Sequence, residues 1–556
     1  IFLSSSSFCC SSSTHLAPCT VSDRNVSFLF SSRIAHAMFK PRLHSLHILR
    51  RACSTQRDGG VRVRYAPSPT GELHIGGLRT ALFNYVFAKQ NNGAFVVRIE
   101  DTDRKRYVEG SETRLMELLN VCGVEPDESF LHGGHFGPYI QSERLDVYRE
   151  HANTLIERGK AYRCFCEDET CSTCLNMNLK DSETRANNGD RFVVRLRVPS
   201  KGIVEFEDHL RGNLTIRNED IDHQILMKSS GFPTYHLASV VDDHLMNISH
   251  VIRGDEWLSS TPKHAHLYDA FEWERPTFVH VPLLMNPDRT KISKRQAHAG
   301  VSTLLDKGIL ASSVINFVAL MGWSPSGDMS HDEIMTTCDL IEKFELSRVK
   351  VSPAIVNPQK LEKMDKLHTL SLCRDILERD DESSHTTLRK SLEIVFRSDD
   401  ELSVEDFSTK YVACVFDALE ARVSLSELLI KTRYFFQDPE FTSLGSNEED
   451  DSDDVRSHQL KVGKRVWTEQ SRDLVLQVLE KFRDLNDSEF QAKRVVKISR
   501  AVSKANKVGM GKVMMPLRYA VSGTDTGASL DRTLDLLGKD TVERRLQWAI
   551  ENHMTV

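Results

Sequence analysis

The chain has 556 residues and a formal net charge of −7, with 40% hydrophobic and 27% charged residues. A chain of this length exceeds the size at which one hydrophobic core keeps growing, so we expect about two to four domains. The composition is typical of a soluble globular protein, and the lack of any run of about 18 apolar residues excludes a transmembrane protein.

The first part of the chain differs in charge from the rest. Residues 1–57 are rich in serine and carry seven Lys/Arg against one acidic residue, Asp23. Such a composition is typical of an organellar transit peptide, and the segment from Met38, MFKPRLHSLHILRRACSTQR, fits it best. We therefore expect residues 1–58 to be a leader, with Met38 as a candidate start, and the mature protein to act in the mitochondrial matrix. A disordered basic tail is the alternative.

The segment after this leader predicts a βαβ unit. VRVRYA (61–66) alternates like a strand, GGLRTALFNYVFAKQ (76–90) has helical spacing, and AFVVRIE (94–100) returns as a short strand. Ligands of open parallel sheets bind beyond the carboxyl ends of the strands, where APSPTGELHIGG and EDTD leave them. Glycines at a helix N-terminus expose backbone N–H groups, so we expect an anionic ligand there.

The rest of the chain changes from mixed to helical. Residues 232–258 read as strand-like and then acidic, and residues 282–297 as a basic loop. Past about residue 370 the pattern is helical throughout, and GSNEEDDSDD (445–454) is an acidic loop. A capping box at Asp540 and Glu543 is expected to open the last helix. One predicted helix has an apolar stripe of Leu474, Val475, Val478, Leu479 and Phe482.

Five motifs, in this order, resemble those of the bacterial-type glutamyl-tRNA synthetases: RYAPSPTGELHIGGLRTALFN, RIEDTD, YHLASVVDDHLM, VIRGDEWL and KISKR. LHIGG and KISKR correspond to the HIGH and KMSKS signatures of class I aminoacyl-tRNA synthetases. The resemblance covers residues 61 to about 375 densely and the helical third more thinly. It implies an α/β Rossmann-type catalytic domain with a parallel sheet, an inserted acceptor-stem domain and an all-α C-terminal anticodon-binding module.

The resemblance also suggests domain boundaries. The catalytic domain would have halves at 59–141 and 235–285, separated by an acceptor-stem-binding insertion at 142–234. The KMSKS loop and stem-contact region would occupy 286–375, and the anticodon-binding module 376–556.

The implied activity is a glutamate–tRNA ligase that uses ATP with Mg²⁺. Positioning and charge stabilisation suffice when a carboxylate attacks the α-phosphate of ATP. The resemblance assigns catalysis to His74, Lys291 and Lys294. It assigns ATP binding to His74, Gly76, Gly77, Glu256, Lys291, Ile292, Ser293, Lys294 and Arg295.

A glutamate pocket is implied as well, because two arginines and one glutamate complement the two carboxylates and one ammonium of the substrate. The implied residues are Arg64, Tyr65, Ala66, Ser68, Glu100, Tyr235, His236, Leu237, Ala238, Ser239 and Arg253. Ser239 departs from the family, since bacterial relatives commonly have Asn there. An ion pair between Arg64 and Glu100 at the sheet edge is the structural alternative.

Four cysteines lie close together in CFCEDETCSTC. Cys164, Cys166, Cys171 and Cys174 are enough for a tetrahedral zinc site, and free reduced thiols are the alternative. Some family members hold zinc in this insertion, but their later ligands fall some 25 residues on, where this chain has neither Cys nor His.

The expected partners are L-glutamate, ATP and tRNA-Glu, with tRNA-Gln left open as a second tRNA substrate, and we expect a monomer without membrane attachment. An acidic chain must meet RNA through local basic patches, such as KLEKMDK, KVGKRVW and RVVKISRAVSKANK. The alternative functions are a non-catalytic tRNA-binding paralogue and a nicotinamide-dependent oxidoreductase. The latter would need GxGxxG after the first strand, and GELHIGG does not match.

Overall fold

The computed structural model describes residues 60–166, 172–290, 300–326, 334–397, 399, 401–439, 461–485 and 491–552. The predicted leader, the KISKR segment and the acidic loop 445–454 lie outside these residues. The described residues fall into two compact units, and the chain passes from one to the other between Asp365 and Lys366.

A six-stranded sheet forms the centre of the N-terminal unit, with the strand order β2-β1-β8-β9-β5-β6. The first five strands are mutually parallel, and β6 runs antiparallel to β5. Their bounds are β1 Arg62–Tyr65, β2 Ala94–Val97, β5 Ile203–Asp208, β6 Gly212–Arg217, β8 His250–Gly254 and β9 Thr277–Val281. The predicted strand–helix–strand start of this unit is confirmed, with helix α1 at Ile75–Gln90 between β1 and β2.

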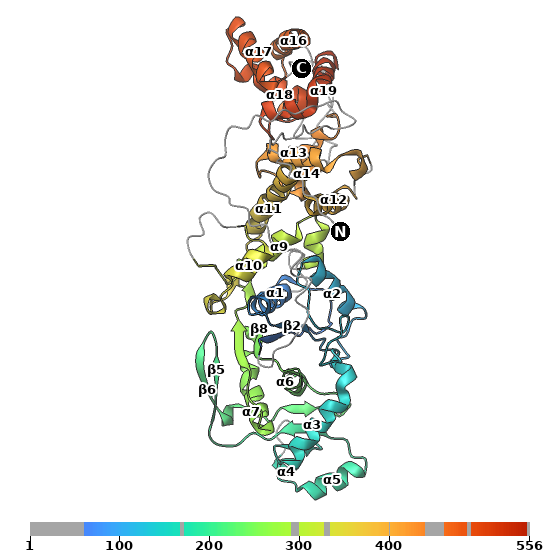
Figure 1. Ribbon diagram of the computed structural model, residues 1–556, viewed down its shortest axis with the longest axis vertical. Helices are drawn as coiled ribbons and strands as arrows, with labels where there is room; N and C mark the ends of the chain where they lie inside the picture. Colours follow the sequence, from blue (N-terminus) through green and yellow to red (C-terminus); the bar gives the residue numbers. More distant parts are fainter. Residues whose placement is uncertain are drawn as a thin grey trace, which may run out of the picture. The chain divides into compact units, whose positions relative to one another are not determined.

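Helices cover the sheet on both faces, which is the doubly wound arrangement (Figure 1). One core packs α1 and α9 (Ala311–Ala319) against Ile252 and Val279, and the other packs α6 (Tyr235–Leu245) and α7 (Thr261–Phe271) against Val251 and Phe278. Successive strand residues therefore point into opposite cores, as expected for a parallel sheet that is buried on both faces. The other helices of this unit are α2 Ser111–Val121, α8 Val301–Asp306 and α10 Thr337–Lys343.

The expectation of strand-like structure after residue 232 is wrong for its first part, because residues 235–245 form α6. Leu237, Ala238 and Val241 recur at helical spacing and are fully buried. A short apolar run of this kind does not distinguish a helix from a buried strand. The strand comes later, as β8.

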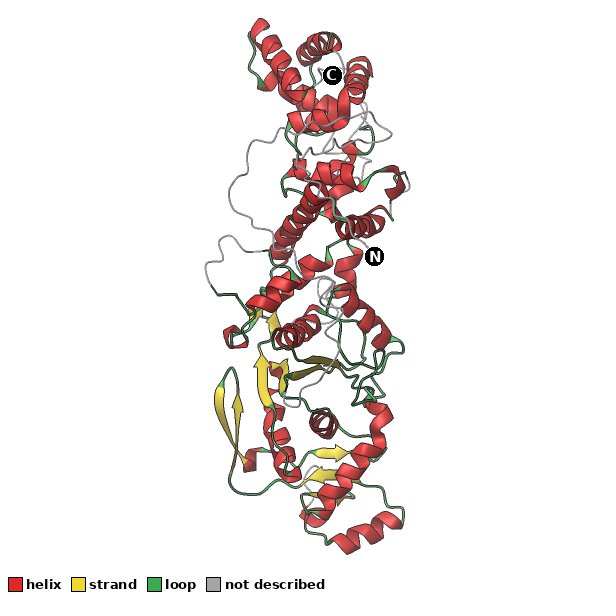
Figure 2. Ribbon diagram, viewed as in Figure 1, coloured by secondary structure: helices red, strands yellow, loops and turns green. Residues whose placement is uncertain are grey.

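The segment predicted as an insertion forms a second, three-stranded sheet with the order β3-β4-β7 (Figure 2). The β5–β6 hairpin does not stay with this sheet, because it joins the edge of the six-stranded sheet beside β9. The insertion is therefore connected to the six-stranded sheet by hydrogen bonds as well as by the chain. Its other elements are β3 Ala161–Cys164, α3 Leu145–Glu157, α4 Ser172–Leu175, α5 Leu179–Asn187, β4 Val193–Leu196 and β7 Ile225–Met227.

Short elements and one long helix complete this unit. A two-stranded sheet of β10 (Leu284–Met285) and β11 (Ala354–Ile355) comes after the six-stranded sheet in the chain. Helix α11 (Pro358–Arg379) then spans the boundary between the two units. The 3₁₀ turns are η1 Gln141–Arg144, η2 Asn218–Asp220, η3 Asp255–Ser260 and η4 Leu346–Arg348.

The C-terminal unit is helical in its described residues, as predicted. The apolar stripe on α16 (Glu469–Arg483) is buried at all five of its positions. Within α19 (Leu530–Asn552) the backbone leaves helical geometry at Gly538, so the last helical segment begins close to the start predicted at Asp540. The Glu543 carboxylate accepts from Arg483 at 2.8 Å. The remaining elements are α12 Glu382–Phe396, η5 Val404–Asp406, α13 Thr409–Leu419, η6 Leu425–Glu427, α14 Leu428–Thr432, η7 Arg433–Phe435, α17 Ala492–Ala505 and α18 Gly511–Ser522. Within the described ranges, no helix has the length and apolarity that crossing a membrane requires.

Candidate active site

A cavity of about 560 Å³ opens at the carboxyl ends of β1, β2 and β8. The chain passes from β1 to β2 on one side and returns as β8 on the other side of β1, so the order of the strands reverses here. Such a switch point is where open α/β sheets bind their ligands. The predicted anion site and the predicted exits of the first two strands therefore meet in one cavity.

The cavity brings together most of the predicted site residues from four separate motifs. Those that line it are Arg64, Tyr65, Ala66, Ser68, His74, Gly76, Gly77, Glu100, Tyr235, Arg253 and Glu256. The predicted ATP-binding residues Lys291, Ile292, Ser293, Lys294 and Arg295 lie outside the described residues.

Four predicted pocket residues, all on α6, do not line the cavity. Leu237, Ala238 and Ser239 are buried in the core beside the sheet, because α6 turns this face inward. His236 instead contacts another histidine: its Nδ1 atom lies 3.1 Å from the Nε2 atom of His264. Only the first residue of the helix, Tyr235, reaches the cavity.

His74 caps helix α1, and the cap fixes its tautomer. Its Nδ1 atom accepts a hydrogen bond from the backbone N–H of Gly77 at 3.0 Å, so the proton of the neutral ring resides on Nε2. The side chain is thus both a helix cap and part of the cavity wall. The Gly77 amide donates to His74 here, and its predicted role in holding a phosphate stays a prediction.

Gly77 is a glycine for a steric reason. A Cβ atom at this position would lie 2.7 Å from the Tyr65 hydroxyl and 3.1 Å from Leu73. Both distances are shorter than a normal contact, and Tyr65 is itself buried. A larger residue at position 77 would therefore displace the tyrosine that lines the cavity.

A buried network of charges holds Arg64 and Glu100. The Nε atom of Arg64 donates to Asp243 at 3.0 Å, and the same carboxylate oxygen accepts from Arg98 at 2.8 Å. Arg98 also donates to Glu100 at 3.1 Å. The alternative of a direct Arg64–Glu100 ion pair is therefore not what forms. Asp243 and Arg98 were not predicted as site residues, although a charge in each of the apolar runs VVRIE and SVVDD was a signal.

Burial raises the pKa of Glu100 to about 7, although Arg98 and Arg64 act in the opposite direction. The carboxylate consequently changes charge near neutral pH. A cation that binds beside it would favour its ionised form.

Arg253 is held in a different way, by neutral groups. Its guanidinium donates to His280 Nε2 at 3.0 Å, to Thr261 Oγ1 at 2.9 Å and to Tyr235 Oη at 3.2 Å. It also lies 3.1 Å from His264 Nδ1. Among the described residues, no carboxylate forms an ion pair with it. Arg253 is buried except where it meets the cavity.

Several cavity residues were missed by the sequence analysis. Arg79 lies on α1 and donates to the carbonyl oxygens of Met321, at 3.1 Å, and Pro282. Lys228 donates to the Thr102 carbonyl at 3.2 Å, and the Trp257 ring lies 4.0 Å from that of Tyr235. All of these side chains line the cavity. Arg79 and Trp257 lie within the motifs RYAPSPTGELHIGGLRTALFN and VIRGDEWL. Lys228 lies outside the motifs, where a lysine carries no signal that separates it from a surface charge.

The cysteine cluster does not form a metal site in the part of the chain that is described. The Sγ atoms of Cys166 and Cys174 lie 3.6 Å apart, but Cys164 contacts the Cys166 carbonyl oxygen at 3.8 Å, and Cys171 lies outside the described residues. No group of three or more His, Cys, Asp or Glu side chains gathers around a possible metal position in the described ranges. The predicted zinc knuckle is therefore not supported.

The fold and the site agree with a known family. Residues 60–363 match the model of tRNA synthetases class I (E and Q), catalytic domain, and residues 387–550 match the anticodon binding domain. Glutamate–tRNA ligase of Chlorobaculum parvum is 40% identical over 516 residues, and that of Chloroherpeton thalassium is 37% identical over 515 residues. Each alignment covers 88% of this chain and 98% of the relative.

Solved structures give the same result. A glutamate tRNA ligase from Elizabethkingia meningosepticum, in complex with its amino acid, matches with a TM-score of 0.74 and 29% identity. Glutamate-tRNA synthetase from Elizabethkingia anophelis matches with a TM-score of 0.72 and 30% identity. Both matches cover 89% of this chain and the whole of the other chain. The protein is a class I aminoacyl-tRNA synthetase. It belongs to the glutamate–tRNA ligase family.

Proposed function

We propose that the cavity at the ends of β1, β2 and β8 is where this enzyme activates L-glutamate with ATP before it charges tRNA-Glu. One observation carries the proposal: the buried guanidinium groups of Arg64 and Arg253 and the buried carboxylate of Glu100 face the same cavity. The third buried guanidinium of the cavity, that of Arg79, donates to the carbonyl oxygens of Met321 and Pro282. Glutamate offers the complementary set of two carboxylates and one ammonium. The N-terminus of α1 lies on the same wall, where the helix dipole favours phosphate.

The proposed chemistry needs no protein nucleophile. The α-carboxylate of glutamate attacks the α-phosphate of ATP, which enters with Mg²⁺, and glutamyl-adenylate and diphosphate form. The terminal ribose hydroxyl of the tRNA then attacks the activated carbonyl and releases AMP. Because positioning and charge stabilisation dominate such transfers, the Nε2–H of His74 would donate to a phosphate oxygen. The family resemblance assigns the contacts with the leaving diphosphate to Lys291 and Lys294.

Measurement of ATP–diphosphate exchange and of tRNA charging tests this function. With glutamate, Mg²⁺ and tRNA-Glu, exchange and charging should both occur, and replacement of glutamate by glutamine or aspartate should reduce both strongly. A protein that binds tRNA but supports neither reaction would be the non-catalytic paralogue. Separate transcripts of tRNA-Glu and tRNA-Gln extend the test, because we propose that tRNA-Gln is also charged, as in many organellar relatives.

We further propose that the enzyme acts in the mitochondrial matrix. The support is the basic, serine-rich and acid-poor composition of residues 1–57. Fusion of residues 38–57 to a fluorescent reporter should direct the reporter to mitochondria. A purely cytosolic signal would contradict import by this segment.

A further inference from the structure

His280 is the residue that holds Arg253 from the neighbouring strand. The two are register partners on β8 and β9, and the His280 side chain is fully buried. A guanidinium has only donors, so the Nε2 atom of His280 must accept from the Arg253 Nε–H. The imidazole is therefore neutral, with its proton on Nδ1.

Asp208 explains why His280 adopts this tautomer. Its Oδ2 atom lies 2.7 Å from His280 Nδ1 and accepts from the His280 backbone N–H at 3.1 Å. Its Oδ1 atom accepts from the backbone N–H groups of Leu210 and Arg211, at 3.1 and 3.0 Å. Four donors thus fix the orientation of this fully buried carboxylate. The pKa of His280 is lowered to about 4, first by burial and then by Arg253, although Asp208 raises it.

Arg64 and Arg253 therefore differ in what balances their charge. Arg64 donates to a carboxylate, that of Asp243. Among the described residues, Arg253 donates only to neutral side chains and to the carbonyl oxygen of Trp257 at 3.5 Å. The nearest carboxylate on this chain of contacts is Asp208, which is separated from Arg253 by the imidazole. An acceptor of this kind orients a cation without pairing its charge.

We propose that His280 and Asp208 are positioning residues for the activation of the amino acid. Asp208 fixes the tautomer of His280, and His280 fixes the plane of the Arg253 guanidinium while leaving its positive charge available to an anionic group of the substrate. This inference rests on the proposed function, because it takes glutamate as the anion that Arg253 meets. Neither residue touches the cavity, so both act through Arg253.

A matched pair of variants separates positioning from simple packing. In His280→Gln, the amide can place its oxygen near the former Nε2 position and keep the acceptor for Arg253. In His280→Asn, the shorter amide can place its nitrogen near the former Nδ1 position, so it keeps the contact with Asp208 and loses the acceptor. Both variants remove a buried imidazole, so a packing role predicts similar losses.

Steady-state tRNA charging and thermal unfolding of the full chain provide the readouts. His280→Asn should lower kcat/KM for glutamate at least about tenfold and change KM for ATP less than about threefold. His280→Gln should recover kcat/KM for glutamate to within about threefold of the parent. If His280→Asn fails to fold, Asp208→Asn replaces it, and it should likewise weaken glutamate use and leave KM for ATP unchanged.

Two results would overturn the inference. One is equal loss for glutamate and ATP in both His280 variants, which is the signature of a packing role. The other is a His280→Asn or Asp208→Asn enzyme with kcat/KM for glutamate within about threefold of the parent. A parent enzyme that does not use glutamate at all refutes the proposed function instead, and it is measured first.

Discussion

At the scale of single residues, the site is built from buried charges whose protonation is linked to substrate binding. Glu100 is the clearest case, because its pKa is raised to about 7 by burial. If the substrate ammonium binds beside Glu100, binding requires the ionised carboxylate. We therefore predict that kcat/KM for glutamate falls as the pH drops below about 7, by at most about tenfold per pH unit. KM for ATP should stay nearly constant over the same range.

The control for this pH dependence is Glu100→Gln, which cannot titrate. Its kcat/KM for glutamate should be lower than that of the parent and should show no break near pH 7. A break that survives in Glu100→Gln would assign the titration to another group and contradict the role of Glu100.

Arg64 and Arg253 should determine kcat/KM for glutamate and have little effect on KM for ATP. In Arg64→Gln or Arg253→Gln, a desolvated substrate carboxylate loses a charge-assisted partner, which costs about 2 to 5 kcal/mol or roughly 30-fold to several thousandfold in kcat/KM. Replacement of either arginine by lysine should keep only part of kcat/KM for glutamate, because the lysine ammonium lacks the planar, two-donor geometry of a guanidinium. The pocket assignment is wrong if both Gln variants keep kcat/KM within about threefold of the parent.

The motifs in the sequence identify the charged residues of the cavity, but they do not identify the buried residues that orient those charges. Arg64, Glu100 and Arg253 could be predicted because each belongs to a motif that lies at or close to the carboxyl end of a strand. Their buried partners are far away in the sequence, as Arg98 and Asp243 are 145 residues apart. Asp208 and His280, 72 residues apart, are a second example. No local pattern indicates which distant charges a fold will bring together.

At the scale of elements, the turn from β1 into α1 joins helix capping to pocket shape. Gly77→Ala would place a methyl group 2.7 Å from the Tyr65 hydroxyl. We predict a loss of about 1 to 3 kcal/mol in unfolding free energy, with lower kcat/KM for both substrates, because Tyr65 must move. Thermal or denaturant unfolding and steady-state kinetics measure the two effects.

Two further variants make this prediction specific. Tyr65→Phe in the Gly77→Ala background removes the hydroxyl and should restore much of the stability. Gly511→Ala is the matched control, since a Cβ there meets no atom within 4 Å, and alanine favours the helix. A Gly77→Ala enzyme as stable and as active as the parent would show that the turn tolerates a side chain.

The elements that the sequence predicted correctly are those with a clear period and clear ends. The units β1, α1 and β2 and the buried stripe of α16 belong to this group. Helix α6 was read as strand-like because a short apolar run fits both periods, and tertiary packing decided between them. The transfer of the β5–β6 hairpin to the catalytic sheet could not be foreseen, since strand pairing across an insertion leaves no local signal.

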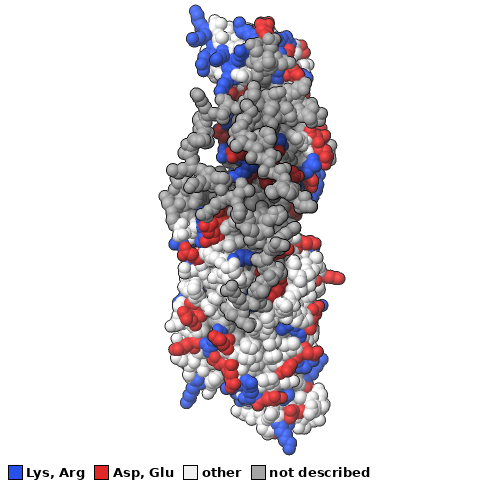
Figure 3. Space-filling view, viewed as in Figure 1, with Lys and Arg blue, Asp and Glu red and all other residues white. Residues whose placement is uncertain are grey.

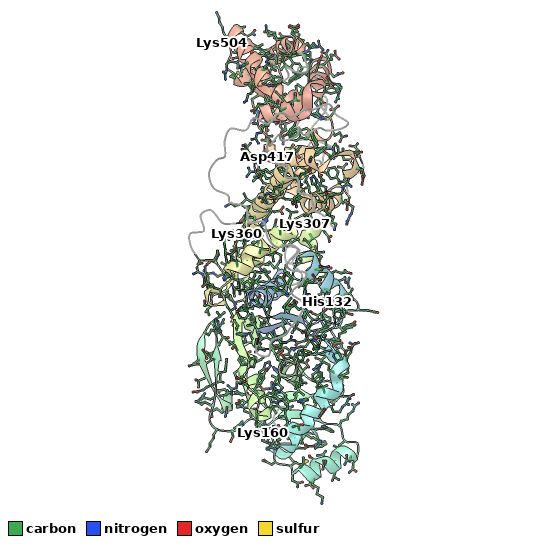
Figure 4. All side chains as sticks on the ribbon, in the orientation of Figure 1. His132, Lys160, Lys307, Lys360, Asp417 and Lys504 are labelled. Carbon is green, nitrogen blue, oxygen red and sulfur yellow. The ribbon has the colours of Figure 1, made fainter. Side chains whose placement is uncertain are left out.

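At the scale of the whole molecule, an acidic protein must bind an acidic polymer. Helix α17 offers a basic face, because Lys493, Lys497, Arg500 and Lys504 recur at spacings of three and four residues and are exposed. The opposite face is buried through Val495 and Val502. Figure 3 shows Lys and Arg side chains gathered near this end of the chain, and Figure 4 shows Lys504 on its helix. None of the four forms an ion pair with another described residue.

We predict that Lys497→Glu with Lys504→Glu weakens tRNA binding and makes it less dependent on salt. The loss of two phosphate contacts should reduce the slope of log affinity against log salt by about 1.5. At saturating tRNA, kcat should be nearly unchanged. Lys307→Glu with Lys390→Glu is a control with the same change in net charge. If both pairs of substitutions weaken tRNA binding equally, the effect comes from the net charge of the protein and not from contacts between α17 and the phosphates.

The buried network around Arg98 also imposes an order on the synthesis of the enzyme. Arg98 leaves the ribosome 145 residues before Asp243, an interval of about 7 to 30 seconds at about 5–20 residues per second. A guanidinium buried without its partners costs several kcal/mol, so the segment from β1 to β2 stays hydrated during that interval. The sheet of the insertion is complete once β7 has been made, whereas the catalytic sheet must wait for α6, β8 and β9. A nascent chain therefore completes its amino-acid pocket only after the insertion has been synthesised, and a chain that ends before β8 lacks Arg253 and with it part of the pocket.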